Sequence, residues 1–306
     1  MGAFLVRRGV RMAIILLLAS IAVFYSLRFA PGDPSGAALS PLALEEARAA
    51  YRERLGLNRP IHEQYAVYLG NLARGDLGSS LVTGRPIAEL LGFYGRNSLA
   101  LGLAAFALSY LIGVPLGVLA AARRNSVVDQ IATGVGIVGM GMPNFWLALL
   151  LIVLFSSHLR WLPSAGCCSP QHLILPALVL AAEGTAVTLR MVRASMLEQL
   201  GGDYVRTHRA KGLRERTVVG SRVFRNALIP VISLSGLRLG WLIGYALIVE
   251  TIFAWPGIGY LLVDSILRRD YPVAQFFSLL LVAAVVVANF LADLAYGLVD
   301  PRIRYA

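Results

Sequence analysis

Long apolar runs alternate with shorter polar segments along most of this 306-residue chain. A helix needs about 20 mostly apolar residues to cross the hydrocarbon core of a membrane. Six runs come close to or exceed that length, at residues 12–29, 98–122, 131–155, 173–189, 231–251 and 276–299. The pattern therefore predicts an all-α integral membrane protein with six transmembrane helices.

The first run follows three arginines, Arg7, Arg8 and Arg11, as the apolar core of a signal peptide also would. This run is longer than a typical signal-peptide core, and no convincing small-residue cleavage site follows it. We therefore expect it to remain in the protein as a membrane anchor.

The basic residues lie between the apolar runs and not on a separate polar domain. Apolar residues make up 57% of the chain and charged residues 15%, and the formal net charge is +11. Arginines precede the first run, follow the second and sixth, and crowd residues 190–225 after the fourth. The positive-inside rule places these segments, and therefore both termini, in the cytoplasm. Membrane lipid is the expected partner of this charge, and nucleic acid is not.

Four parts follow from this topology. We expect an N-terminal tail with the first transmembrane helix (1–30), an extracytoplasmic cap (31–97), a five-helix core (98–300) with a cytoplasmic loop at 194–230, and a cytoplasmic tail (301–306). Apolar residues at helical spacing predict two amphipathic helices in the cap, at 41–55 and 61–72.

Motifs of catalysis are missing from the sequence. It contains neither the GxxxxGK[ST] phosphate-binding loop nor a GxSxG nucleophile pattern, and its four histidines lack metal-ligand spacing. The only cysteines, Cys167 and Cys168, are adjacent, a spacing that strains a disulfide, so we expect them to be two small apolar loop residues. We predict no catalytic site, no metal site and no cofactor on this chain.

The cytoplasmic loop is the most distinctive polar stretch. Asp203 can cap a helix over 204–211 that Gly212 terminates, and a second helix can run from 214 to 228 and stop at Pro230. Two interpretations of the first helix stay open on these residues alone. A short basic helix can lie on anionic lipid headgroups, or it can dock into a groove on a soluble partner.

Polar residues inside the predicted spans are costly in lipid and commonly face a partner or a water-filled path. Pro143 can kink the third span, while Gly139 and Gly141 can admit a neighbouring helix. Packing alone is the competing explanation for these residues, and Asp293 near the cytoplasmic end can simply meet loop cations. The candidates for lining a path are Arg238, Glu250, Glu183, Met140 and Asn144.

Sequence motifs along nearly the whole chain resemble one protein family. The matching stretches are RFAPGDP (28–34), LGLNRPIHEQYAVYLGNLARGDLGSS (55–80), MPNFWLALLL (142–151), ILPALVLA (174–181), DYVRTHRAKGL (203–213), RNALIP (225–230), ETIFAWPGIGYLLVDSILRRDYPV (250–273) and NFLADLAYGLVDPRIR (289–304). They resemble the B-type membrane permease subunits of the peptide/nickel ABC importer family, which covers dipeptide, oligopeptide and nickel or opine systems. One departure is that the proline of the general cytoplasmic-loop consensus would fall at Arg225, whereas this chain has Pro230.

This resemblance implies a type I ABC importer permease fold in the bacterial inner membrane and ATP-driven, binding-protein-dependent import of di- or oligopeptides or of a related solute such as chelated nickel. The implied partners are a second homologous permease subunit, which completes the translocation path, two ABC ATPase subunits that bind ATP and Mg, and an extracytoplasmic substrate-binding protein. The cytoplasmic loop would form the coupling helix that docks into the ATPase. The implied coupling residues are Asp203, Tyr204, Arg206, Thr207, Arg209, Ala210, Lys211, Gly212 and Leu213.

Two other classes of protein fit the sequence less well. A membrane enzyme would need an acid/base or nucleophile cluster near one interface, and no such cluster is present in the sequence. A proton-coupled secondary transporter would normally carry more spans or an inverted repeat, neither of which is visible. Co-purification with an ATPase would distinguish these classes from an ABC permease.

Overall fold

The computed structural model describes residues 2–29, 45–167 and 169–299. The structure describes the backbone but not the side chains of residues 2–5, 54, 233–234, 236–242 and 291–299. The chain divides into two compact units. The first comprises the residues up to 98 together with 256–287, and the second comprises 99–255 together with the segment from 288 onward.

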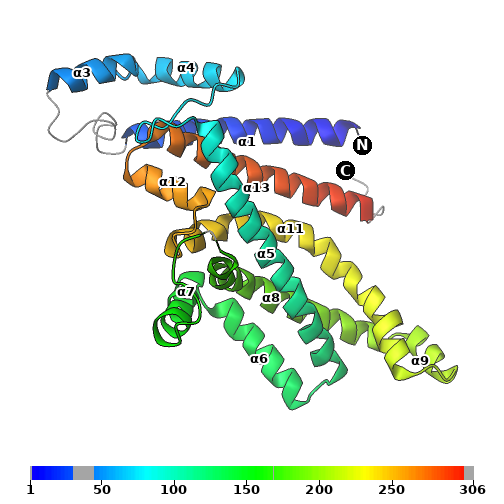
Figure 1. Ribbon diagram of the computed structural model, residues 1–306. Coiled ribbons are helices and arrows are strands. Elements are labelled where there is room, and N and C mark those ends of the chain that lie inside the picture. Colours follow the sequence, from blue (N-terminus) through cyan, green and yellow to red (C-terminus); the bar gives the residue numbers. More distant parts are fainter. Residues whose placement is uncertain (1, 30–44, 168, 300–306) are drawn as a thin grey trace. The chain divides into compact units, whose positions relative to one another are not determined.

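The described part of the chain is helical, with one isolated bridge between Ser79 and Pro86 as its only strand-like pairing (Figure 1). The α-helices are α1 (Gly2–Phe29), α3 (Glu45–Arg54), α4 (Ile61–Ala73), α5 (Ile87–Ala122), α6 (Val127–Gly141), α7 (Asn144–Leu151), α8 (Pro170–Leu200), α9 (Asp203–Ala210), α10 (Glu215–Thr217), α11 (Phe224–Ile252), α12 (Ile258–Leu267) and α13 (Tyr271–Val299). Two π-helical segments, η1 (Ile152–His158) and η2 (Val218–Val223), continue α7 and join α10 to α11.

Four described helices are long and apolar enough to cross a membrane, namely α1, α5, α8 and α13. They coincide with the predicted spans at 12–29, 98–122, 173–189 and 276–299. The predicted span at 231–251 lies in α11, where several side chains are outside the description. The all-helical membrane class is therefore confirmed, whereas the number of six spans stays a prediction.

The predicted third span, 131–155, is not one straight helix. α6 and the α7–η1 segment meet at a bend of 110° around Met142 and Pro143. A residue that precedes proline avoids the helical region of backbone space, and Met142 is accordingly extended, with φ −87° and ψ 121°. The sequence predicted a kink at Pro143, and the structure has a complete break.

The predicted helix stop at Pro230 is wrong, because Pro230 lies inside α11. The proline removes one backbone hydrogen bond and crowds the carbonyl of Asn226 one turn earlier. α11 nevertheless continues to Ile252, and it packs along α8 over much of its length. Tertiary packing therefore outweighs the local cost of the proline.

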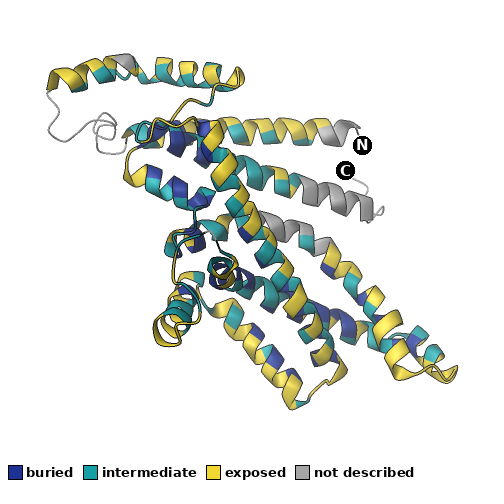
Figure 2. Ribbon diagram, in the orientation of Figure 1, coloured by how far each residue is buried: buried dark blue, intermediate teal, exposed yellow. Residues whose placement is uncertain are grey.

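α8 is the central helix of the second unit and contacts α6, α7 and α11. Figure 2 shows buried residues along most of its length. Two apolar clusters surround it. One includes Leu101, Leu175, Val179, Val249 and Phe253, and the other includes Val192, Met196, Val205, Val218 and Val223.

Close helix contact in this unit occurs at glycines that the sequence analysis did not single out. A Cβ atom on Gly113 would lie 2.8 Å from the Thr185 carbonyl oxygen, and one on Gly117 would lie 2.7 Å from the Leu189 carbonyl oxygen. α5 and α8 can approach this closely only because neither glycine has a side chain. A Cβ atom on Gly139, by contrast, would make only ordinary contacts with α8, and one on Gly141 would meet open space.

The first unit contains the two cap helices. α4 matches the predicted helix at 61–72, and α3 covers the described part of the one predicted at 41–55. α1 and α4 meet through rings of Phe24, Tyr65 and Tyr68, and Ser20 is hydrogen-bonded to the Tyr65 hydroxyl at 2.8 Å. Aromatic packing thus fixes the cap on the end of the first helix.

Candidate functional site

The short helix α9 stands between the end of α8 and the start of α10 (Figure 1). Its residues divide into two faces. Val205 is fully buried in the cluster formed with Met196 and Val218, and Tyr204 packs beside it. The Tyr204 hydroxyl also donates a 2.9 Å hydrogen bond to Gln199 on α8. One face therefore anchors α9 to its own subunit.

The other face of α9 and the turn after it are exposed. The exposed residues are Asp203, Arg206, Thr207, Arg209, Ala210, Lys211, Gly212 and Leu213. Eight of the nine residues assigned to coupling by the resemblance are thus accessible, and the ninth, Tyr204, is half-buried. A helix held on one side and exposed on its basic side can contact lipid headgroups or another protein.

Gly212 ends this helix as the sequence predicted. Its φ of 74° is in the left-handed region that favours glycine. The Gly212 N–H donates to the Arg209 carbonyl at 2.9 Å, and the Leu213 N–H donates to the His208 carbonyl at 3.3 Å. These two bonds form the Schellman arrangement that satisfies free carbonyls at a helix end. Asp203 is the first helical residue, and Gly202 takes the capping position that was predicted for Asp203.

An ion pair closes the turn across Gly212. Nε of Arg209 lies 3.1 Å from Oε2 of Glu215, and Nη2 lies 2.5 Å from Oε1. The Arg209 guanidinium, by hydrogen bonding, holds the pKa of the Glu215 carboxyl below its ordinary value. This two-bond contact links α9 to α10 across the turn.

The elements that carry the predicted path residues pack together in the second unit, since α6, α7 and α11 all belong to the set around α8. Met140 is exposed and accepts a 3.1 Å contact from Nη1 of Arg190, whereas Glu183 and Asn144 are half-buried. Glu250 is only 1% exposed. The side chain of Arg238 lies outside the described residues, as does that of Asp293. Their roles stay predictions.

The expectation for the cysteines is wrong for Cys167, which is disulfide-bonded. The only other cysteine in the sequence, Cys168, lies outside the described residues.

One polar contact near the loop was missed by sequence reasoning. Asp129, in the first turn of α6, is 3% exposed and binds Arg193 on α8. The only local signal was Ser126 three residues before Asp129, which is typical of a helix start. Ser126 does cap α6 by accepting from the Asp129 N–H at 3.3 Å.

The apolar helices define a multi-pass membrane protein. Residues 113–305 match the model of the family described as binding-protein-dependent transport system inner membrane component, and residues 1–89 match the model of its N-terminal part. The chain is 41% identical to the oligopeptide transport system permease protein AppB of Bacillus subtilis (strain 168), over all of both proteins. It is 38% identical to the glutathione transport system permease protein GsiC of Escherichia coli (strain K12), over 99% of each.

The fold also resembles that of a chain in a solved ABC transporter. A chain of the MetNI methionine ABC transporter superposes with a TM-score of 0.57 at 20% identity, covering 70% of this chain and 97% of that one. This chain therefore belongs to the family of binding-protein-dependent transport system inner membrane components. Its predicted assignment to the permease subunits of the peptide/nickel type of ABC importer is confirmed.

Proposed function

We propose that this chain is the permease subunit of an ATP-driven importer for short peptides, including glutathione-like ones, in the bacterial inner membrane. The names of the full-length relatives support this cargo class, because they concern oligopeptide and glutathione systems. In this proposal a second homologous permease completes the path, two ATPase subunits supply energy from ATP and Mg, and an extracytoplasmic binding protein delivers the cargo.

α9 is the proposed coupling element. The single observation that carries this role is the division of α9 into a buried anchor at Val205 and an exposed basic face. A partner that pushes on the exposed face moves α8 and η2 with it, because Val205 is packed in one cluster with Met196 and Val218. Since α11 continues from η2, the displacement is passed along a helix into the apolar part of the chain.

The proposed path lies among α6, α7, α8 and α11. Alternating access requires that helices shift against one another, and the break at Pro143 divides one predicted span into two shorter helices. Two short helices can change their relative angle more readily than one continuous helix. Met140 and Asn144 flank this break, which supports their place among the path candidates.

Transport of defined solutes tests the cargo. The complex, purified with its co-purifying subunits and binding protein, is reconstituted into liposomes with ATP and offered labelled L-alanyl-L-alanine, glutathione or histidine-chelated nickel. We expect ATP-dependent uptake of a peptide and no uptake of nickel. Uptake of chelated nickel without peptide uptake would assign the cargo to the other branch that the resemblance allowed.

Accessibility from the two sides tests the topology. The proposal puts α9 and both termini in the cytoplasm and the cap outside. Thr207 on α9 and His62 on α4 are both exposed, so cysteines placed there should react with a membrane-impermeant maleimide. Only His62→Cys should be labelled in intact cells, and Thr207→Cys should require permeabilised cells. Labelling of both in intact cells would contradict the topology.

A further inference from the structure

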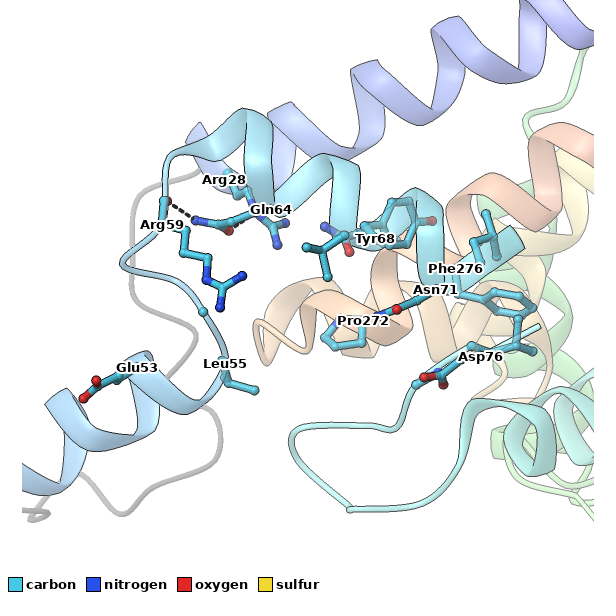
Figure 3. A pocket seen from close by; sticks show the side chains of 16 residues that line it. Arg28, Glu53, Leu55, Arg59, Gln64, Tyr68, Asn71, Asp76, Pro272 and Phe276 are labelled. Atoms are coloured by element: carbon cyan, nitrogen blue, oxygen red, sulfur yellow. Dashed lines mark hydrogen bonds between the residues drawn. The ribbon is translucent and has the colours of Figure 1, made fainter. Parts of the chain in front are cut away.

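A cavity of about 370 Å³ in the first unit is separate from the proposed path. It is lined by the end of α1, the cap helices and the start of α13, and none of the path candidates borders it (Figure 3). Its volume is in the range of pockets that hold small molecules. Its lining is mixed in character, and its charged and amide side chains include Arg28, Glu53, Arg59, Gln64, Asp76 and Gln275.

Two buried hydrogen-bond donors of this cavity have no partner within the described part of the chain. They are Nη1 of Arg28 and Nε2 of Gln275, which is only 4% exposed as a residue. A buried donor without a partner loses its hydration and gains nothing in return, and the penalty is larger for a charged group. Two such donors lining one cavity indicate an acceptor that the described residues do not supply.

The Arg28 guanidinium is held in place by its other contacts. Its Nε donates to Oε1 of Gln64 at 2.9 Å, and its central carbon lies 3.8 Å from the centroid of the Phe24 ring. Gln64 is itself fixed, because its Nε2 donates to the carbonyls of Leu57 at 3.1 Å and Arg59 at 2.9 Å. The unpaired Nη1 is therefore oriented before any ligand arrives, which lowers the entropic cost of binding.

The two donors line the same cavity. The Arg28 guanidinium carbon lies 5.7 Å from the centroid of the Tyr271 ring, and Gln275 follows Tyr271 by one helical turn on α13. Residues four apart lie on the same face of a helix, so Gln275 shares with Tyr271 the face of α13 that the guanidinium approaches. If the Gln275 amide were rotated by about 180°, it would present its carbonyl oxygen in place of its NH2 group. The preference for an anion therefore comes from the positive charge of the Arg28 guanidinium.

We propose that this cavity binds the carboxylate of a small solute, with Arg28 and Gln275 as its hydrogen-bond donors. A guanidinium matches the planar, two-oxygen geometry of a carboxylate better than that of other anions of this size. Glu53 and Asp76 border the same cavity and lie away from Arg28 in Figure 3, so a solute that also carries an ammonium group is tolerated. The ligand class is therefore a small amino-carboxylate such as a dipeptide.

Direct binding to the full chain tests the proposal. The protein, purified with its co-purifying subunits in lipid nanodiscs and without binding protein, is titrated with L-alanyl-L-alanine and with its C-terminal amide, and binding is followed by saturation-transfer NMR. We expect saturable binding of the dipeptide and at least about tenfold weaker binding of the amide, the usual loss for one hydrogen bond to a charged group.

Variants separate binding from folding. Gln275→Leu is close in shape and removes a donor that has no partner in the described structure, so we expect an unchanged or higher melting temperature with about tenfold weaker dipeptide binding. Arg28→Gln should abolish binding, and Arg74→Gln, on an exposed cap residue outside the cavity, should leave it unchanged.

Equal binding of the dipeptide and its amide, or unchanged binding in Gln275→Leu, would overturn the proposal. So would a lack of saturable dipeptide binding, the result expected if an acidic side chain of a docking protein enters the cavity instead. Each of these outcomes leaves the proposed import function intact, because that function is measured by uptake and does not require this cavity.

Discussion

Arg193 and Asp129 form a two-bond ion pair between α8 and α6. Nε of Arg193 lies 2.6 Å from Oδ1 of Asp129, and Nη2 lies 2.8 Å from Oδ2. The backbone N–H of Asn125 donates to the same carboxylate at 2.9 Å. One carboxylate therefore links the loop before α6, the first turn of α6 and the C-terminal half of α8.

Asp129→Asn should destabilise the protein, because it removes the negative charge and leaves Arg193 without its counter-charge. Loss of one partner of a buried pair is far more costly than loss of an exposed one. We expect the unfolding temperature in detergent, measured by tryptophan fluorescence, to fall by several degrees. Glu89→Gln, which breaks the exposed pair with Arg85, is the control and should shift it little. Equal shifts would mean that the Asp129 pair is only a surface contact.

Gly117→Ala should disturb the contact between α5 and α8. The added Cβ would lie 2.7 Å from both the Leu189 carbonyl oxygen and Cβ of Val192, so the two helices must move apart. Overpacking of this kind costs about 1–3 kcal/mol. Thermal unfolding of the purified protein would measure it.

Gly102→Ala is the matched control, since Gly102 lies on the same helix and has nothing within 4 Å of the added atom. Alanine favours the helix by about 0.5–1 kcal/mol over glycine, so this variant should be equally or more stable. If neither Gly117→Ala nor Gly102→Ala lowered the stability, α5 and α8 would be able to move apart at Gly117 without cost, and the predicted overpacking would be wrong.

The sequence predicted those parts of the fold that local patterns determine. Apolar runs located the long helices, helical spacing located α4, and Gly212 marked the end of α9. Each of these signals is contained within a few turns of chain. The same applies to the kink at Pro143, although its extent was underestimated.

Contacts between distant residues could not be predicted in this way. Pro143 interrupts a helix, whereas Pro115, Pro176 and Pro230 lie within helices. Packing against neighbouring helices decides whether a helix continues through its proline. Asp129 and Arg193 are 64 residues apart. The orientation of α5 toward α8, which gives Gly117 its role, likewise follows from tertiary structure alone.

Low pH should loosen the turn after α9. Arg209 lowers the pKa of Glu215 in the folded protein, so the ion pair contributes fully above the ordinary glutamate pKa and is lost as the pH falls through the lowered value. The hydrogen-exchange protection factors of residues 203–217, which are corrected for the slower intrinsic exchange at low pH, should therefore fall at acidic pH. Glu215→Gln should show the lower protection factors already at neutral pH and lose this pH dependence. An acid-sensitive turn in Glu215→Gln would assign the effect to another group.

Gly212→Val tests whether α9 couples to an ATPase. At a φ of 74° a β-branched residue is strained by about 1 kcal/mol or more, which favours a different exit of the chain from α9. The buried anchor at Val205 is unaffected, so we expect normal insertion and complex yield. Uptake and binding-protein-stimulated ATP hydrolysis by the reconstituted complex should both fall severalfold. Basal hydrolysis should change less, because the ATPase subunits themselves are intact.

The control for this variant is Gly220→Val, because Gly220 lies in η2, has a negative φ and has open space around it. A general sensitivity of the loop to added bulk would impair both variants, whereas a specific need for the left-handed turn impairs only the one at Gly212. Alanine at position 212 should lie between glycine and valine, since it meets the same backbone strain without β-branching. Full stimulated hydrolysis with valine at Gly212 would remove α9 from the coupling role and favour its interpretation as a helix that rests on lipid headgroups.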